Sequence, residues 1–303
     1  MKIIHILFLA SIIFSLVWAE EKIPSIFLRG ENPWICYKRN DSIICVIKVD
    51  NFYPGNWKKI NVFSGMEVGP PSLVLSQVYP GDYGSMGYVV YEKKDFRRGK
   101  NYICFNAFDS LGIHYTTVLD SGNIPTESLE KDCYVSSPSI ALTYGDYLHI
   151  VWEKEGRIYY KTTLQRVYPH LIRRGEPIIW SATMPVSFAP GYPTEPASNP
   201  SVEAQGEYVY VVWRGPNEEG NRDFGEIWQR VGRIRPGDIP EWLYPPKNLS
   251  KSPLRESNYP QMSTGAVCVW QESLPNNNEV YVNIKFLFQK NKFSKKDERI
   301  SSF

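Results

Sequence analysis

The sequence predicts an all-β fold: a single β-propeller, most simply of five four-stranded blades, that follows an N-terminal signal peptide. A unit of short strand, glycine-centred turn and second strand recurs along the chain and is clearest over residues 200–214. Its second strand, Val209–Trp213, is apolar at successive positions, so both of its faces must be buried. A blade packed between two neighbouring blades provides that burial. The 21 glycines and 23 prolines suit a chain with many turns.

The repeat accounts for four strands in each of five copies. The copies open with Pro-Ser-apolar, or a looser form of it, at Pro24, Pro71, Pro138, Pro200 and Pro260. A third strand is expected in each at Ser42–Val49, Asn101–Ala107, Arg157–Thr162, Glu226–Val231 and Glu279–Phe286. A fourth, less regular strand is expected at Lys59–Phe63, Tyr115–Leu119, Pro177–Ser181, Asn248–Ser250 and Arg299–Ser301. Such a period is typical of propeller blades. Two consecutive β-sandwiches and a truncated larger propeller are the alternatives.

The N-terminus has the pattern of a secretory signal. Met1-Lys2 precedes an apolar run from Ile3 to Trp18, and Val17-Trp18-Ala19 offers a cleavage site. The alternative, a transmembrane anchor, needs about 20 apolar residues, and this run is shorter. We therefore expect a signal peptide over 1–19 and the propeller over 20–303. The mature protein is then exported, with no membrane span after cleavage, to the periplasm, the cell surface or the medium.

Export permits disulfides, and the chain has five cysteines. If Asn40-Asp41 is a two-residue turn, Cys36 faces Cys45 across a hairpin, where a bridge is plausible. The alternative is two small buried side chains next to each other. A second bridge could join Cys104 to Cys133, and Cys268 reads as a buried apolar filler. None of the five has the spacing of zinc ligands.

Charge and composition exclude little but give two negative expectations. The acidic and basic residues nearly cancel to a net charge of +2. Such a balance gives no electrostatic argument for a nucleic-acid partner or an anionic membrane. No pattern predicts a metal or a cofactor, and the oligomeric state cannot be inferred.

In a propeller, the residue after each repeated aromatic points toward the mouth of the channel. These residues could bind a polar ligand such as a sugar or peptide, and the carboxylates could act as acid and base on a glycosidic bond. The plainer alternative is a set of strand-end polar residues that form weak surface ion pairs. The positions are Lys38, Glu92, Glu153, Arg214 and Gln271, with Glu272 adjacent.

Other candidate residues carry weaker signals. Tyr192, in the Pro- and Gly-rich loop Ser187–Asn199, is an exposed binding candidate. His149 lies within an apolar strand and is expected to be buried and hydrogen-bonded rather than catalytic. The repeated aromatics are expected to pack between blades: Tyr91, Trp152, Trp213 and Trp270.

The recurring Pro-Ser-Ile, Val-Val-Trp-Glu and Ile-Tyr-Tyr segments resemble the degenerate blade repeat of secreted bacterial propellers related to the sialidase superfamily (BNR-like). The resemblance covers the mature chain and implies the fold more than the function. True sialidases add Ser-x-Asp-x-Gly-x-Thr-Trp boxes and an arginine triad. Asp120–Gly122 and Asn248-Leu249-Ser250 do not match such a box.

The sequence does not decide whether this is an enzyme. Variable loops on a regular scaffold without catalytic signatures favour an exported binding module, for carbohydrate or a cell-surface protein. The alternative is a propeller-type glycoside hydrolase, sialidase-like or arabinanase-like, that uses two of Glu92, Glu153 and Glu272. A structural surface protein without a small ligand is the third reading.

Overall fold

The computed structural model describes residues 25–29, 32–48, 57–76, 85–124, 134–143, 146–220, 225–252, 255–263, 267–273 and 280–286. The expected signal peptide, Cys133 and the strand expected at Arg299–Ser301 lie outside the described residues. Within the described ranges, no helix is long and apolar enough to cross a membrane.

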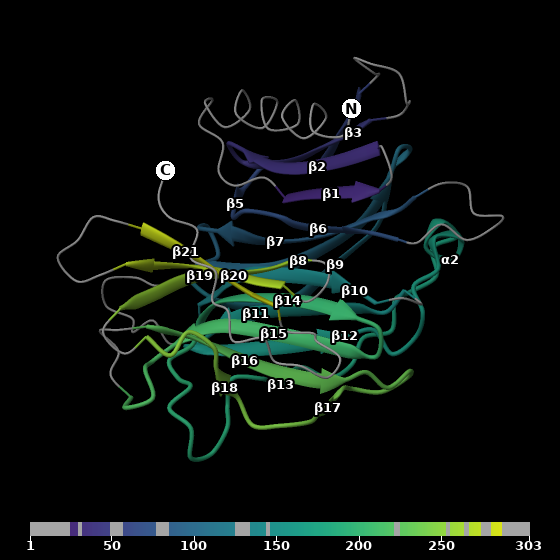
Figure 1. Ribbon diagram of the computed structural model, residues 1–303. Helices are drawn as coiled ribbons and strands as arrows, with labels where there is room; N and C mark the ends of the chain where they lie inside the picture. Colours follow the sequence, from purple (N-terminus) through teal and green to yellow (C-terminus); the bar gives the residue numbers. More distant parts are fainter. Residues whose placement is uncertain are drawn as a thin grey trace, which may run out of the picture.

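The fold is a β-propeller whose described strands form antiparallel sheets, one from each copy of the repeat (Figure 1). Blade 1 contains β1 (Ser25–Arg29), β2 (Asn32–Arg39), β3 (Ser42–Lys48) and β4 (Trp57–Ser64). Blade 2 contains β5 (Glu67–Val68), β6 (Ser72–Leu75), β7 (Gly87–Asp95), β8 (Lys100–Asp109) and β9 (Gly112–Asn123).

The remaining sheets follow the same order. Blade 3 contains β10 (Val135–Leu142), β11 (Leu148–Lys154), β12 (Arg157–Thr162) and β13 (Met184–Pro185). Blade 4 contains β14 (Ser198–Gln205), β15 (Tyr208–Gly215), β16 (Glu226–Arg233), β17 (Glu241–Trp242) and β18 (Lys247–Asn248). Blade 5 is described over β19 (Glu256–Ser263), β20 (Val267–Ser273) and β21 (Val280–Phe286). The number of blades in the complete ring stays a prediction.

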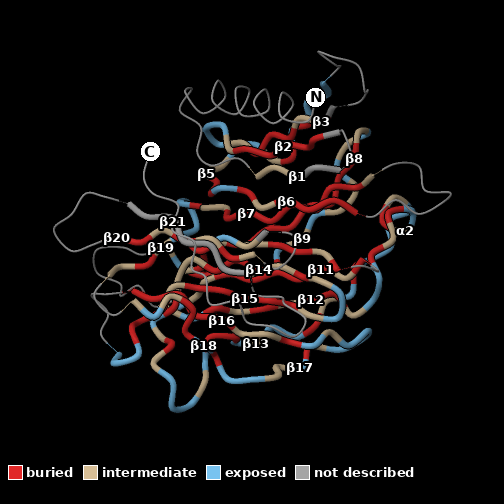
Figure 2. Tube along the Cα trace, viewed as in Figure 1, coloured by how far each residue is buried: buried red, intermediate tan, exposed pale blue. Residues whose placement is uncertain are grey.

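Apolar side chains pack between successive blades, as the two-faced apolar strands predict. One core cluster joins blades 1 and 2, a second joins blades 2 and 3, a third joins blades 3 and 4, and a fourth joins blades 4 and 5. Buried residues run along the strands and exposed residues gather in the turns (Figure 2). The expected packing role of the repeated aromatics is confirmed, because Tyr91, Trp152, Trp213 and Trp270 are all buried.

The serine of the Pro-Ser-apolar motif links each inner strand to the next blade. Its hydroxyl oxygen accepts a hydrogen bond from the backbone N–H that follows the equivalent position of the next repeat. Because the donor is on another blade, the motif serine connects neighbouring blades in addition to forming part of its own strand. We call these bonds the serine belt: Leu73 to Ser25 (2.9 Å), Ile140 to Ser72 (3.2 Å), Val202 to Ser139 (3.2 Å) and Met262 to Ser201 (2.9 Å).

The proline of the motif marks a β-bulge in three blades. The ladder between the inner and second strands shifts register just before this proline, and the bulged residue has a positive φ. Proline has no N–H to give to the ladder, so it fits a position where the pairing is interrupted. In blade 2 the inner strand is instead divided into β5 and β6. The bulged residues are Ser137, Asn199 and Tyr259, each with φ 50°.

The less regular strands were predicted less well. The third strand Arg157–Thr162 is confirmed, and the fourth strands of blades 1 and 2 are confirmed in longer form. The strand expected at Pro177–Ser181 is wrong: only Trp180 makes an isolated bridge there, and the pairing strand is β13. A short helix, α2 (Pro169–Arg173), occupies part of this connection and has proline in its first turn. In blade 4, the last strand is replaced by the two-residue strands β17 and β18.

The Cys36–Cys45 bridge is not formed, and the alternative of two small buried side chains is confirmed; of the second expected pair, Cys133 lies outside the described residues. The hairpin register is confirmed, with Asn40 in the turn at φ 48° and Cys36 opposite Cys45. The two thiols are nevertheless free and fully buried, and they pack as small side chains in the core between blades 1 and 2. A disulfide needs its two Cβ atoms and their directions to match closely, which strand register alone does not ensure. Cys104 is also free, and Cys268 is the buried filler that the sequence predicts.

Candidate active site

The expected site residues lie at one end of their blades. Here the second strand of each sheet ends and the inner strand begins, and we call this the mouth end. Glu153 is opposite Ser136, and Glu272 is opposite Ser257. The backbone carbonyl oxygen of Glu92 accepts a hydrogen bond from the Gly69 backbone N–H at 2.9 Å. The repeat therefore places Glu92 and Glu153 equivalently, whereas Glu272 comes one residue after the matching Gln271 and so points to the other face of its sheet.

Glu92 is a buried carboxyl group at the junction of blades 2 and 3. Its Oε1 accepts a hydrogen bond from the Tyr134 hydroxyl, on the segment that enters blade 3. Gly69 packs directly against it: a Cβ at Gly69 would lie 3.3 Å from Glu92 Oε2. The glycine thus gives the carboxyl room beside the chain between β5 and β6.

Burial raises the pKa of Glu92, and the nearby Glu67 carboxylate acts in the same direction. The Tyr134 hydrogen bond, the Lys94 charge and the Asn101 amide oppose this increase in pKa but do not cancel it. Lys94 is itself bound to Glu67, with Nζ 2.8 Å from Oε1. Glu92 therefore holds a proton to a higher pH than an exposed glutamate.

Tyr134 brings the second predicted carboxylate, Glu153, into the same electrostatic neighbourhood. Burial raises the pKa of Tyr134, followed in effect by its hydrogen bond to Glu92 and by the charges of Glu92, Glu67 and Glu153. Glu153 ends the apolar part of β11 and is half-buried. Tyr134 thus donates a hydrogen bond to Glu92 and feels the charges of Glu67 and Glu153, and we call Glu92, Glu67, Glu153 and Tyr134 the carboxylate cluster.

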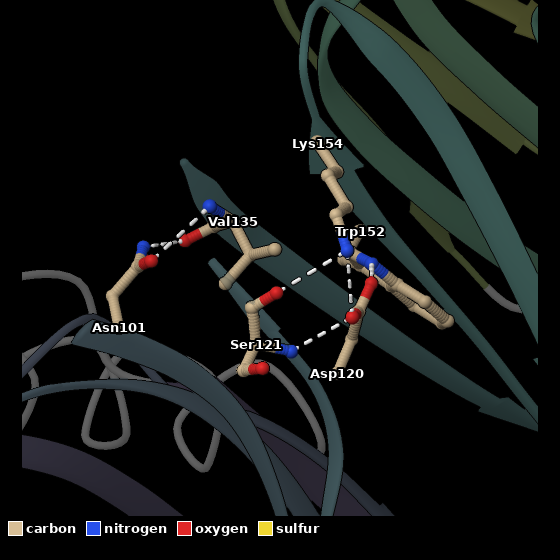
Figure 3. A network of polar contacts seen from close by, with 6 residues as sticks. All are labelled: Asn101, Asp120, Ser121, Val135, Trp152 and Lys154. Atoms are coloured by element: carbon tan, nitrogen blue, oxygen red, sulfur yellow. Dashed lines mark hydrogen bonds and ion pairs between the residues drawn. The ribbon is translucent and has the colours of Figure 1, made fainter. Parts of the chain in front are cut away.

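A polar network fixes the two blades beside this cluster (Figure 3). Asp120, near the end of β9, accepts hydrogen bonds from Trp152 Nε1 at 2.9 Å and from Lys154 Nζ at 2.8 Å. On the other side of the junction, the Asn101 amide donates to the Val135 backbone carbonyl. These bonds hold the strands that carry Glu92 and Glu153 in a fixed relation, since each bond crosses from blade 2 to blade 3.

The mouth end of blades 4 and 5 is built differently. Arg214 extends over Gly225, where a Cβ would lie 2.4 Å from Arg214 Nε, and its Nη2 lies 3.3 Å from Glu256 Oε1. Glu272 is buried and accepts from Ser252 (2.8 Å), Trp270 Nε1 (3.2 Å) and Arg255 (3.3 Å). This carboxylate thus has three hydrogen-bond donors within the protein, one of them a cation, which gives it a structural role.

The other sequence-predicted residues do not join the cluster. Lys38 and Gln271 are half-buried at the ends of β2 and β20. Tyr192 is 44% exposed, as expected for a binding loop. Its loop is fixed to the β11–β12 turn, because Arg157 pairs with Glu195 at 3.0 Å and lies over the Phe188 ring.

His149 behaves as predicted for a core histidine. It is fully buried, its Nδ1 lies 2.6 Å from the Tyr160 hydroxyl oxygen, and burial lowers its pKa to about 3. The ring is neutral at physiological pH and contacts no carboxylate. Among the described residues, no three His, Cys, Asp or Glu side chains are grouped as metal ligands.

Two acidic residues were missed in the sequence. Glu203, on the inner strand β14, has its pKa raised to about 7 by burial. Glu226 is buried beside Asn248, whose amide donates to it, and burial raises its pKa as well. The available signal for Glu203 was an acidic residue between the apolar Val202 and Ala204 of an inner strand. Glu226 gave no signal, because it follows a variable loop.

Comparisons with known proteins give structural likeness only. No family model and no curated protein matches the chain. A GH43 endo-arabinanase from Bacillus licheniformis is 12% identical, with a TM-score of 0.44 over 88% of this chain and 94% of that one. An α-L-arabinanase from Cellvibrio cellulosa, complexed with arabinohexaose, is 13% identical, with a TM-score of 0.43 over 86% and 90%. An endo-arabinase from Bacteroides thetaiotaomicron is 13% identical, with a TM-score of 0.43 over 88% and 94%. At these scores the likeness carries nothing about activity.

Proposed function

We propose that the protein hydrolyses a glycosidic bond at the mouth end of blades 2 and 3, with Glu92 as the proton donor. The observation that carries the proposal is a buried carboxyl group whose pKa is raised and which lies in the second half of β7, beside Tyr134 and Gly69. A glycosidase acid must keep its proton near neutral pH in order to give it to the leaving-group oxygen.

Glu153 is the second carboxylate of this proposal. It is less buried than Glu92, belongs to the next blade, and acts electrostatically on the same tyrosine hydroxyl. It would attack the anomeric carbon or take a proton from the attacking water, while Glu92 protonates the departing oxygen. The separation of the two carboxyl groups in a substrate complex decides between these routes: about 5 Å for attack with retention, and about 6.5–9.5 Å for inversion through water.

The test is a cleavage and retention screen with purified protein on arabino-, xylo- and sialyl-oligosaccharides. Glu92→Gln keeps the shape but removes the proton, so cleavage should fall about 100- to 10,000-fold while retention persists. Glu207→Gln is the matched control, because this exposed glutamate lies in the β14–β15 turn at the other end of blade 4. Equal cleavage by the wild type and Glu92→Gln would refute the proposal.

A binding module that does not cleave is the second candidate. The observation that favours it is the number of mouth-end charges already paired within the protein, as for Arg214 with Glu256 and Glu272 with Arg255. Retention of an oligosaccharide without cleavage, unchanged in Glu92→Gln, would support this candidate.

Two finer expectations belong to the proposal. The BNR-like repeat relates the fold to sialidases, but sialidase chemistry would need an arginine triad on the substrate carboxylate, and sialyllactose in the panel tests it. Export is inferred from residues 1–19. Intact-mass measurement of the protein recovered outside the cytoplasm should show a chain that begins near Glu20.

A further inference from the structure

A cavity lies between the outer strand of blade 1 and the sheet of blade 2, and the carboxylate cluster does not line it. Its volume is about 310 Å³, and its walls come from β4, β7, β8 and β9. The lining is largely apolar. The rings of Phe63 and Tyr91 lie on its inner side with centroids 5.5 Å apart, and Ile113 and Val118 are exposed on its rim.

A buried amide oxygen without a partner faces this cavity. Asn106 is 1% exposed, and its Nδ2 donates to the Val62 carbonyl at 2.8 Å. A carbonyl oxygen can only accept, so the amide orientation is fixed and Oδ1 is the remaining atom. Within the described part of the chain, this Oδ1 has no hydrogen-bond partner. Such an atom is costly to leave unpaired, and a donor from a bound molecule would satisfy it.

The side chain of Lys93 also lines this cavity and carries a positive charge. Lys93 Nζ lies 5.6 Å from the Phe63 ring centroid and 5.2 Å from that of Tyr102. Among the described residues, Lys93 makes no ion pair, and it is held only by these ring contacts. The cation–π contacts keep the ammonium near the cavity without neutralising it, so it remains available to an anion.

We propose that this cavity binds a small aromatic carboxylate that carries an N–H donor. The aromatic body would fill the space beside Phe63 and Tyr91, the N–H would bond to Asn106 Oδ1, and the carboxylate would pair with Lys93. Apolar walls with a few convergent polar groups are typical of small-molecule sites. The site is independent of the proposed hydrolysis, because the cavity does not include Glu92 or Glu153.

The test compares three probes by isothermal titration calorimetry. Indole-3-acetate has all three features, 1-methylindole-3-acetate lacks the N–H, and indole lacks the carboxylate. Indole-3-acetate should bind with one site per chain, and each of the other two should bind about three- to tenfold more weakly, as expected for one lost hydrogen bond or ion pair. Absence of saturable binding, or equal affinity for all three, would overturn the proposal.

Two variants locate the bound probe. Lys93→Met keeps the aliphatic stem, and it should weaken indole-3-acetate while leaving indole unchanged. Val118→Trp fills the rim from an exposed strand position and should weaken all three probes. Circular dichroism and the unfolding midpoint confirm that each variant is folded. Unchanged binding in both folded variants would place the probe elsewhere and reject the cavity as its site.

Discussion

Glu92 and Glu272 sit at nearly equivalent places in the repeat, at the end of the second strands of blades 2 and 5, yet their surroundings are opposite in character. Glu92 is buried near the Glu67 carboxylate, and both effects favour its protonated form, although the Tyr134 hydrogen bond opposes them. Glu272 instead accepts hydrogen bonds from a serine, an indole and an arginine. The repeated strands determine the position of each carboxyl group, and residues of non-repeated segments contribute to its environment.

The largest contrast is expected in stability. Glu272→Gln removes the charge that Arg255 and Trp270 Nε1 bind, and it should lower the free energy of unfolding by about 2 kcal/mol. Glu92→Gln should cost less than about 1 kcal/mol, because burial already disfavours the charge that the substitution removes. Urea unfolding at pH 7 measures both. Equal losses would mean that the two carboxyl groups do not differ as described.

Glu203 tests whether burial alone can raise the pKa of a glutamate, as it does at Glu92. Its folded-state pKa, raised to about 7, means that the folded protein binds a proton that the unfolded chain releases above about 4.5. The cost of burying the charged Glu203 carboxylate is therefore absent at low pH, and it grows as the pH rises from about 4.5 to about 7.

Glu203→Gln should accordingly raise stability at pH 8 by about 1–2 kcal/mol, after allowance for solvent screening, and should change it little at pH 4. Urea unfolding of wild type and variant across this pH range checks the sign. A variant less stable than wild type at pH 8 would show that the charged carboxylate has a stabilising partner.

The smallest effect should be the same in both regions. Ser72→Ala removes the acceptor for Ile140 N–H between blades 2 and 3, and Ser201→Ala removes that for Met262 N–H between blades 4 and 5. Each should cost about 1 kcal/mol, because one part-buried hydrogen bond is lost. A large difference between the two would indicate that the scaffold, and not only its side chains, differs between the junctions.

Most of the fold could be predicted from the sequence because each repeat contains the apolar strands, turn residues and motif residues that determine its structure. Strands apolar on both faces required a layered all-β arrangement, and the Asn40-Asp41 turn determined the pairing of Cys36 with Cys45. The proline and serine that marked each copy proved to be a bulge and an inter-blade bond. The short outer strands could not be predicted, since a two-residue strand such as β13 leaves no periodic pattern in the sequence.

The site could be predicted only in part. The repeat identified Glu92, Glu153 and Glu272 as mouth-end residues, but it could not separate a proton donor from a paired anion. That distinction comes from the burial of Glu92 near Glu67, and from Arg255, which lies in a non-repeated segment and binds Glu272. The register also predicted that Cys36 and Cys45 face each other, but it could not distinguish a bridge from two buried thiols.

The most direct test of the proposed proton donor is an NMR titration of the Glu92 side-chain carboxyl carbon, assigned by its absence in Glu92→Gln. It needs no substrate. The account predicts a titration midpoint clearly above the ordinary glutamate value of about 4.3. It also predicts a further rise in Tyr134→Phe, which removes the hydrogen bond that opposes the shift. A midpoint at or below the ordinary value would make Glu92 a charged acceptor like Glu272, and would contradict its role as an acid.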